Sequence, residues 1–302
     1  MKKIASLMAA LMLMTVAFAG CGSTDNSSSS AAEGSAVSSE SSAAADSSAA
    51  SESSEEASTT ETGDYGEFTT VEDGKLIMST NAQFPPYEMV ADGEGFNGTG
   101  FEGIDVEIAS AIADKLGLEL QIDDMEFDSA LLAVQNNTAD VMLAGLSFSE
   151  ERDEVVDFTT SYATGVQVVI VKDGSDVNMD NLGEKMIGTQ RGTTGYIYAS
   201  DTPENGGYGE DHVQAYDSGA TAVQALLNGQ IDAVIIDQAP AEEFVAANKG
   251  LSILPGNWKE EQYCAAVDDG NEVLLTAIDT ALTELIEDGT VQEILDKYIS
   301  AE

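Results

Sequence analysis

The chain has 302 residues and a formal net charge of −44, from 55 acidic and 11 basic side chains. This charge excludes binding to nucleic acid or to anionic lipid through a basic surface, and it disfavours anionic substrates unless local donors override the field. Hydrophobic residues make up 43% of the chain, which is typical of a globular protein with one large or two ordinary domains.

The first residues have the pattern of a bacterial secretion signal. Met1-Lys2-Lys3 is basic, residues 4–19 are apolar, and small residues precede a lone Cys21. This end resembles a lipobox, although Phe18 stands where leucine is usual. We predict that residues 1–21 are a lipoprotein signal peptide and that Cys21 carries the lipid; the alternative is a plain secretory signal, cut after a small residue.

Residues 22–66 differ in composition from everything that follows. They are rich in Ser, Ala, Thr and Glu and contain nine acids, no bases and few large apolar side chains. Such a segment cannot bury a core, so we expect a disordered tether between the lipid and the folded part.

From residue 68 onward, strand and helix patterns alternate, which indicates an α/β fold. The expected elements of the first half are a strand at residues 75–80, a loop at 81–87 stiffened by two prolines, a hairpin tip at 92–100, a helix at 104–116, a strand at 118–122, a helix at 129–136 and a strand at 141–144.

The segment after this last strand combines several signals of a binding site. Gly145 interrupts the apolar run, Ser147 follows, and Ser149 is a suitable N-cap for a helix with Arg152 in its first turn. Arg152 is one of only two arginines, and its residue pattern allows two interpretations. It could lie in an exposed turn with surface ion pairs, or it could clamp a carboxylate with help from Gly145 and Ser147.

A helix–turn–Asp–strand pattern occurs twice. Residues 131–142 contain Asp140, and residues 225–236 contain Asp232 in the same place, 92 positions later. Two copies in the same order indicate two lobes of similar build.

Ligands of open α/β sheets bind beyond the carboxyl ends of the strands. This rule brings together residues 81–87 and 145–152 from one lobe with residues 190–195 and Asp237 from the other. They offer an arginine, hydroxyl groups, glycine amides, a carboxylate and aromatic rings, which together complement a zwitterion. The GTTG sequence at residues 192–195 lacks the lysine of a phosphate-binding loop.

Residues 77–299 resemble the polar-amino-acid-binding proteins of ABC importers, which form solute-binding family 3 and have the type II periplasmic-binding-protein fold. The resemblance rests on several long motifs in the expected order: TNAQFPPYE, GIDVEIASAIADKLG, MEFDSALLAVQ, AGLSFSEERDEVVDFTTSY, GTQRGTTGYIY, LLNGQIDAVIID and EDGTVQEILDKY.

The resemblance implies which residues bind the α-carboxylate and the α-ammonium group of the ligand. Arg152 would grip the α-carboxylate, with help from Ser147 and the backbone amide of Thr194. Asp237 and the carbonyl of Gly145 would hold the α-ammonium group.

It also implies how the ligand side chain is held. Phe84 and Phe127 would sandwich it, while Asn81 and Gln190 would contact its far end. Spacing alone favours core positions for the two phenylalanines, although the prolines beside Phe84 place it on a loop, and Asp237 could also cap the helix that follows it.

The implied architecture is two lobes, each a central sheet flanked by helices, joined by two hinge strands. Residues 67–164 and 266–302 would form lobe 1, and residues 165–265 would contain the hinge strands and lobe 2. The hinge strands themselves are expected near residues 165–169 and 261–265.

Two positions depart from the family pattern. Asn81 stands where relatives often have aspartate, and Gln83 stands where many have glutamate. The loss of two negative charges favours a neutral polar ligand such as glutamine over arginine.

We therefore predict a monomeric, non-enzymatic lipoprotein that captures a free polar amino acid and delivers it to an ABC permease and its ATPase. It would be lipid-anchored at the extracellular face of the cell membrane, and the long acidic tether favours a Gram-positive cell. Two alternatives have the same fold: a cyclohexadienyl dehydratase-like enzyme with Glu88 as general acid, and a ligand-sensing receptor domain.

Overall fold

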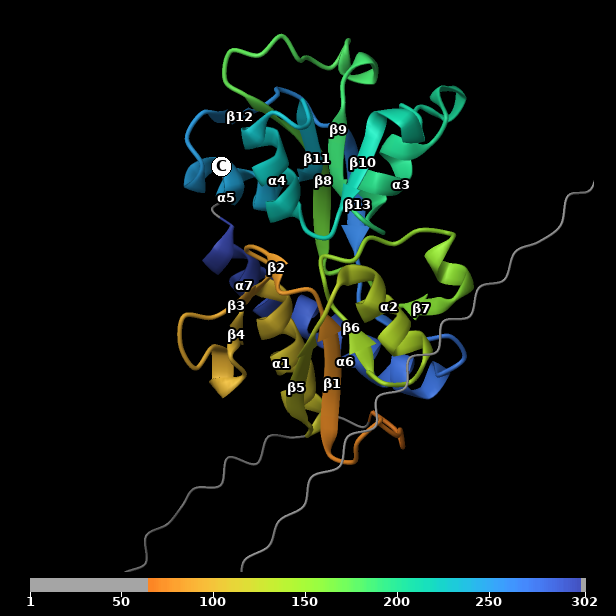
Figure 1. Ribbon diagram of the computed structural model, residues 1–302. Coiled ribbons are helices and arrows are strands. Elements are labelled where there is room, and N and C mark those ends of the chain that lie inside the picture. The colour runs from red at the N-terminus through yellow and green to blue at the C-terminus, as the bar shows by residue number, and fades with distance from the viewer. Residues whose placement is uncertain (1–64, 300–302) are drawn as a thin grey trace, which may run out of the picture. The chain divides into compact units, whose positions relative to one another are not determined.

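The computed structural model describes residues 65–299. The predicted signal peptide, the lipidated Cys21 and nearly all of the predicted tether lie outside these residues. The described residues belong to one compact unit, which contains two main sheets and one small sheet (Figure 1). Within this part of the chain, no helix combines the length and apolar character needed to cross a membrane.

The first main sheet has the strand order β5-β1-β6-β14-β7. Strand β1 runs parallel to β5 and β6, whereas β14 runs antiparallel to β6 and β7. Its strands are β1 (Lys75–Thr80), β5 (Glu119–Asp124), β6 (Val141–Met142), β7 (Val156–Phe158) and β14 (Ala266–Asp268).

Four helices pack on this sheet and on one another, with α1 in contact with α6 and α7, and α2 in contact with β1 and β14. Their bounds are α1 (Ile104–Leu116), α2 (Phe127–Gln135), α6 (Glu272–Glu287) and α7 (Thr290–Tyr298). The small antiparallel sheet adjoins α1 and consists of β2 (Gln83–Phe84), β3 (Glu88–Val90) and β4 (Phe101–Glu102).

The second main sheet has the order β10-β9-β11-β8-β12, and β13 also pairs with the long strand β8. Its strands are β8 (Ala163–Lys172), β9 (Ile187–Gln190), β10 (Val213–Tyr216), β11 (Ala233–Asp237), β12 (Leu251–Ile253) and β13 (Lys259–Tyr263). The helices of this lobe are α3 (Thr194–Ser200), α4 (Gly219–Asn228) and α5 (Gln238–Ala247).

Five short 3-10 turns complete the structure: η1 (Phe96–Gly98), η2 (Arg152–Glu154), η3 (Leu182–Glu184), η4 (Pro203–Asn205) and η5 (Glu210–His212).

The chain crosses between the two lobes twice, once from β7 into β8 and once from β13 into β14. The crossing strands β8 and β13 are antiparallel, with Tyr263 opposite Ala163 and Lys259 opposite Gln167. The two-lobed α/β fold with two hinge strands is thus confirmed, while the lobe limits at residues 164/165 and 265/266 stay predictions.

The repeated aspartate has the same structural task in each lobe. Asp140 accepts a hydrogen bond from the amide of Ile77 at 2.7 Å, and Asp232 accepts one from the amide of Met186 at 2.9 Å. Asp140, just before β6, therefore binds the neighbouring strand β1, and Asp232, just before β11, binds the residue that precedes the neighbouring strand β9. This satisfies a backbone donor that would otherwise lack a partner.

Candidate functional site

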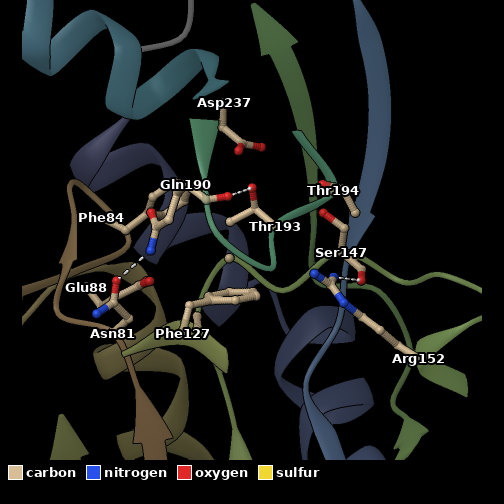
Figure 2. A pocket seen from close by; sticks show the side chains of 12 residues that line it. Asn81, Phe84, Glu88, Phe127, Ser147, Arg152, Gln190, Thr193, Thr194 and Asp237 are labelled. Atoms are coloured by element: carbon tan, nitrogen blue, oxygen red, sulfur yellow. Dashed lines mark hydrogen bonds between the residues drawn. The ribbon is translucent and has the colours of Figure 1, made fainter. Parts of the chain in front are cut away.

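A pocket is lined by residues from both lobes, at the carboxyl ends of their strands. It holds about 340 Å³ of space between atoms, part of it open to solvent. All nine predicted ligand-binding residues line it: Asn81, Phe84, Phe127, Gly145, Ser147, Arg152, Gln190, Thr194 and Asp237 (Figure 2). Glu88, Ala144 and Thr193 complete the lining.

The guanidinium of Arg152 is buried at the pocket and bonded to backbone carbonyls. Its Nη1 donates to the carbonyl of Ser147 at 2.6 Å, and its Nη2 donates to the carbonyl of Gly192 at 2.9 Å. Arg152 is 5% exposed, and among residues 65–299 no acid forms an ion pair with it. The interpretation as an exposed residue in surface ion pairs is therefore wrong.

The local sequence explains how Arg152 is positioned. Ser149 Oγ accepts from the amide of Arg152 at 3.2 Å, but the predicted helix is a 3-10 turn of three residues whose N-cap position is Glu151. The guanidinium lies 5.4 Å from the ring centroid of Phe127, which gives one face of the cation an aromatic neighbour. Burial lowers the pKa of Arg152, and the charge of Glu261 opposes this shift.

The hydroxyl groups beside Arg152 donate to a carboxylate that the sequence did not indicate. Glu261 Oε2 accepts from Ser147 Oγ at 3.0 Å, from Thr194 Oγ1 at 2.9 Å and from Gln167 Nε2 at 3.0 Å. Glu261 is buried on β13, so this acid joins the two lobes and the hinge.

Asp237 lies at the end of β11 with its carboxyl group buried. It accepts from Gln167 Nε2 at 2.8 Å and from the hydroxyl of Tyr263. Asp237 occupies the N-cap position of α5 but makes no side-chain cap bond, so the capping interpretation is wrong. Burial, followed by the charge of Glu261, raises the pKa of Asp237 to about 7.

Two phenylalanines supply the apolar surface of the pocket. Phe84 and Phe127 are each 8% exposed and also belong to the hydrophobic clusters of the fold, so the core and pocket interpretations both hold. Gly145 makes room for the first ring: its φ is +51°, and a Cβ there would lie 2.7 Å from Cε1 of Phe84.

A pair of amides joins the lobes at another part of the pocket. Gln190 Nε2 donates to Asn81 Oδ1 at 2.9 Å, and Asn81 Nδ2 donates to the carbonyl of Met125 at 2.8 Å (Figure 2). Gln83 is exposed and does not line the pocket, so it cannot contribute to the expected loss of charge there.

The sequence indicates Glu88 only as a possible general acid and gives no signal for Asp105. Glu88 is buried in the pocket wall beside Asn81 (Figure 2). Asp105, in the first turn of α1, accepts from the amide of Gly145 at 2.7 Å and from the hydroxyl of Tyr162 at 2.9 Å. The signal for these acids was weak, because acids in a hairpin strand and in a first helical turn are usually solvated.

Comparison with known proteins gives the family. The profile of the bacterial extracellular solute-binding proteins, family 3, matches residues 76–301. The L-cystine-binding protein TcyJ of Escherichia coli (strain K12) is 30% identical over 235 residues, covering 76% of this chain and 85% of that protein.

Two further relatives are also amino-acid-binding proteins. The arginine-binding extracellular protein ArtP of Bacillus subtilis (strain 168) is 31% identical over 232 residues, covering 76% of this chain and 87% of that protein. The arginine-, lysine-, histidine-binding protein ArtJ of Geobacillus stearothermophilus superposes with a TM-score of 0.68 at 31% identity, covering 76% of this chain and 96% of that one. This chain belongs to family 3 of the bacterial extracellular solute-binding proteins.

Proposed function

We propose that this protein captures a polar α-amino acid between its two lobes and delivers it to an ABC importer. The observation that carries the proposal is that the buried guanidinium of Arg152 and the buried carboxyl group of Asp237 line the same pocket. A guanidinium suits an α-carboxylate and a carboxylate suits an α-ammonium group, so the pair recognises a zwitterion.

The remaining lining residues supply the other contacts of the proposed ligand. Ser147 and Thr194 bring hydroxyl groups close to Arg152, and the carbonyl of Gly145 is a further acceptor for the ammonium group. Phe84 and Phe127 offer apolar contact to the ligand side chain. The named relatives bind cystine, arginine, lysine or histidine, which are all α-amino acids.

We favour a neutral polar side chain, such as that of glutamine. The support is the amide pair of Asn81 and Gln190, which offers both a donor and an acceptor without formal charge. Clear micromolar binding of arginine without any binding of glutamine would contradict this preference.

The expected partners are a membrane permease and its ATPase, to which a monomeric protein would present the ligand. Membrane attachment would come from a lipid on Cys21, at the extracellular face of a Gram-positive cell membrane. Metabolic labelling with a palmitate analogue tests this attachment, and Cys21→Ser should remove the label.

The enzyme alternative has one observation in its favour. Glu88 lines the pocket, and burial with the charge of Asp105 raises its pKa well above the usual range, as a general acid requires. Turnover of prephenate or arogenate by the purified protein would support a dehydratase, and its absence would leave the binding function.

The main test is thermal shift and calorimetry of the purified chain against the twenty amino acids and cystine. One α-amino acid should raise the melting temperature, and Arg152→Ala should weaken its binding about 100-fold or more, because an α-carboxylate loses its buried cation. Arg191→Ala is the matched control, since the side chain of the second arginine is 57% exposed and, within residues 65–299, forms an ion pair only with the surface acid Asp217. A flat result across the panel would overturn the proposal.

A further inference from the structure

Glu88 is an unusual component of the pocket wall. It lies at the start of β3, is 1% exposed and lines the pocket. Neither of its carboxyl oxygens receives a hydrogen bond from a donor within residues 65–299. A buried carboxylate without donors is costly, so the group must carry a proton or meet a ligand.

Asp105 lies beside Glu88, because its backbone amide donates to the carbonyl of Tyr87, the residue before Glu88, at 2.9 Å, and a side-chain hydrogen bond with Asp105 contributes to the raised pKa of Glu88. Asp105 Oδ2 already accepts from the amide of Gly145 and the hydroxyl of Tyr162, whereas Oδ1 has no donor in the described part of the chain. Two buried carboxyl groups in contact cannot both ionise at low cost. The proton belongs on Glu88, because the two donors to Asp105 favour its ionised form.

The other groups around Glu88 also favour its protonated form. The other charged groups that influence Glu88 are the carboxylates of Asp237 and Asp124, and the phenols of Tyr87 and Tyr162 are also nearby. Burial raises the pKa of Glu88 well above its usual range, and the negative charges of Asp105, Asp237 and Asp124 raise it further, whereas the two phenols keep their protons.

We propose that Glu88 determines the charge preference of the pocket for the ligand side chain. The proton on Glu88 leaves the carboxyl group that lines the pocket uncharged, while the negative charge of the pair stays on Asp105, which does not line the pocket, so a neutral polar side chain is accepted. A cationic side chain, such as that of arginine, binds only when Glu88 releases its proton to solvent and pairs with it as a carboxylate. This inference rests on the proposed function.

The proposal predicts a pH dependence of the ratio between arginine and glutamine affinities. Protonation of Asp237 affects every α-amino acid through the ammonium group, so it cancels in this ratio. Glu88 acts only on the ligand side chain, so its protonation still changes the ratio. The ratio should rise with pH, by up to about tenfold per pH unit while Glu88 is protonated.

Two substitutions should move the ratio in different ways. Glu88→Gln should make the ratio independent of pH, because a neutral amide replaces the titrating group. Asp105→Asn should raise the ratio about tenfold or more, because an amide can donate to Glu88 and stabilise its carboxylate. Glu102→Gln, on the neighbouring strand β4 and exposed, should leave the wild-type profile unchanged.

The experiment is calorimetric titration of the full chain with arginine and with glutamine from pH 6 to pH 8.5, with circular dichroism as the check on folding. In wild type, arginine should release about one more proton than glutamine, measured in two buffers of different ionisation enthalpy. A pH-independent ratio in wild type would overturn the inference, as would a Glu88→Gln profile equal to that of wild type.

A second measurement separates this inference from the proposed function. In the ligand-free chain, ¹³C NMR should show one glutamate carboxyl that titrates well above the usual glutamate range and disappears in Glu88→Gln. Absence of this signal would overturn the inference while leaving amino-acid binding intact. Its presence in a chain that binds no amino acid would overturn only the proposed function.

Discussion

At the scale of single residues, the pocket depends on ionisable groups that burial and neighbouring charge shift from their usual behaviour. Asp237 shows the balance. Hydrogen bonds from Gln167 and Tyr263 favour its carboxylate, yet burial and the charge of Glu261 outweigh them and raise its pKa to about 7. The ligand-free pocket therefore holds Asp237 partly protonated near neutral pH.

This balance predicts the pH dependence of ligand binding. An α-ammonium group needs the ionised Asp237, so binding must release the proton that the raised pKa retains. Affinity for glutamine should fall as the pH drops below about 7, approaching tenfold per pH unit. Calorimetry between pH 5.5 and pH 8 checks this, and Asp237→Asn should bind weakly with a flat profile. A flat profile in wild type would contradict the assignment of Asp237 to the ammonium group.

Gly145 is a second residue whose identity the pocket requires. Gly145→Ala should lower the free energy of unfolding by about 1–3 kcal/mol and weaken ligand binding about tenfold or more, because the new Cβ displaces the ring of Phe84. Gly174→Ala is the matched control: its φ is +74°, but no atom lies within 4 Å of the added Cβ. It should cost about 1 kcal/mol through the backbone alone and leave binding unchanged. Equal binding losses in the two variants would exclude the Phe84 contact as the cause.

At the scale of elements, the hinge strands carry more of the site than their sequence indicates. Glu261 on β13 receives hydrogen bonds from Ser147 in the first lobe, Thr194 in the second and Gln167 on β8. One carboxylate oxygen thus links three elements at the edge of the pocket.

The role of this carboxylate can be tested by stability. Glu261→Gln should lower the free energy of unfolding of the ligand-free protein by about 1–3 kcal/mol, because charge-assisted hydrogen bonds from three donors become weaker. Glu260→Gln is the matched control on the same strand, since Glu260 is exposed and its side chain points to the other face. Thermal unfolding of the two variants should differ clearly; equal melting temperatures would show that Glu261 does not join the elements.

The elements also show where sequence reasoning succeeds and where it stops. The pocket loops could be located because each follows a short apolar strand and contains Gly, Ser, Thr or Asp. Glu261 could not be located in this way, because β13 has the sequence KEEQY. Only the pairing of β13 with β8 determines which face of β13 is buried. Asp105 was missed for a related reason: α1 is buried nearly all round, so its polar residues do not mark a solvent face.

One boundary error bears directly on the site. The second helix was expected to begin at residue 129, but α2 begins at Phe127. The early start places this ring at the N-terminal end of the helix, against the guanidinium of Arg152. The resemblance to the family supplied the role of Phe127, which periodicity alone could not.

At the scale of the whole molecule, the proposed function requires the two lobes to close around the ligand. Contacts already cross the pocket in this structure: Gln190 donates to Asn81 at 2.9 Å, and Arg152 donates to the carbonyl of Gly192 at 2.9 Å. Such contacts make closure a shift between an open and a closed population, in which the ligand adds further bonds to the closed form.

Gly192 is a place where closure can be opposed at a residue that does not line the pocket. It has a φ of +73° in the second lobe, and a Cβ there would overlap the carboxyl group of Asp128 in the first lobe, with Cγ at 2.6 Å. The Asp128 side chain is exposed, so either it swings aside about its Cα–Cβ bond or the lobes stay apart. Gly192→Ala should therefore oppose closure.

Small-angle X-ray scattering with and without the amino acid found in the panel checks this. Wild type should show a smaller radius of gyration when the ligand is added. Gly192→Ala should show no decrease and bind about tenfold more weakly or worse, because the open form lacks the contacts of one lobe. Gly206→Ala is the control in the same lobe, with a φ of +93° and open space around the added Cβ. If Gly192→Ala closes as wild type does, the added methyl group does not obstruct the approach of the lobes, and this prediction is wrong.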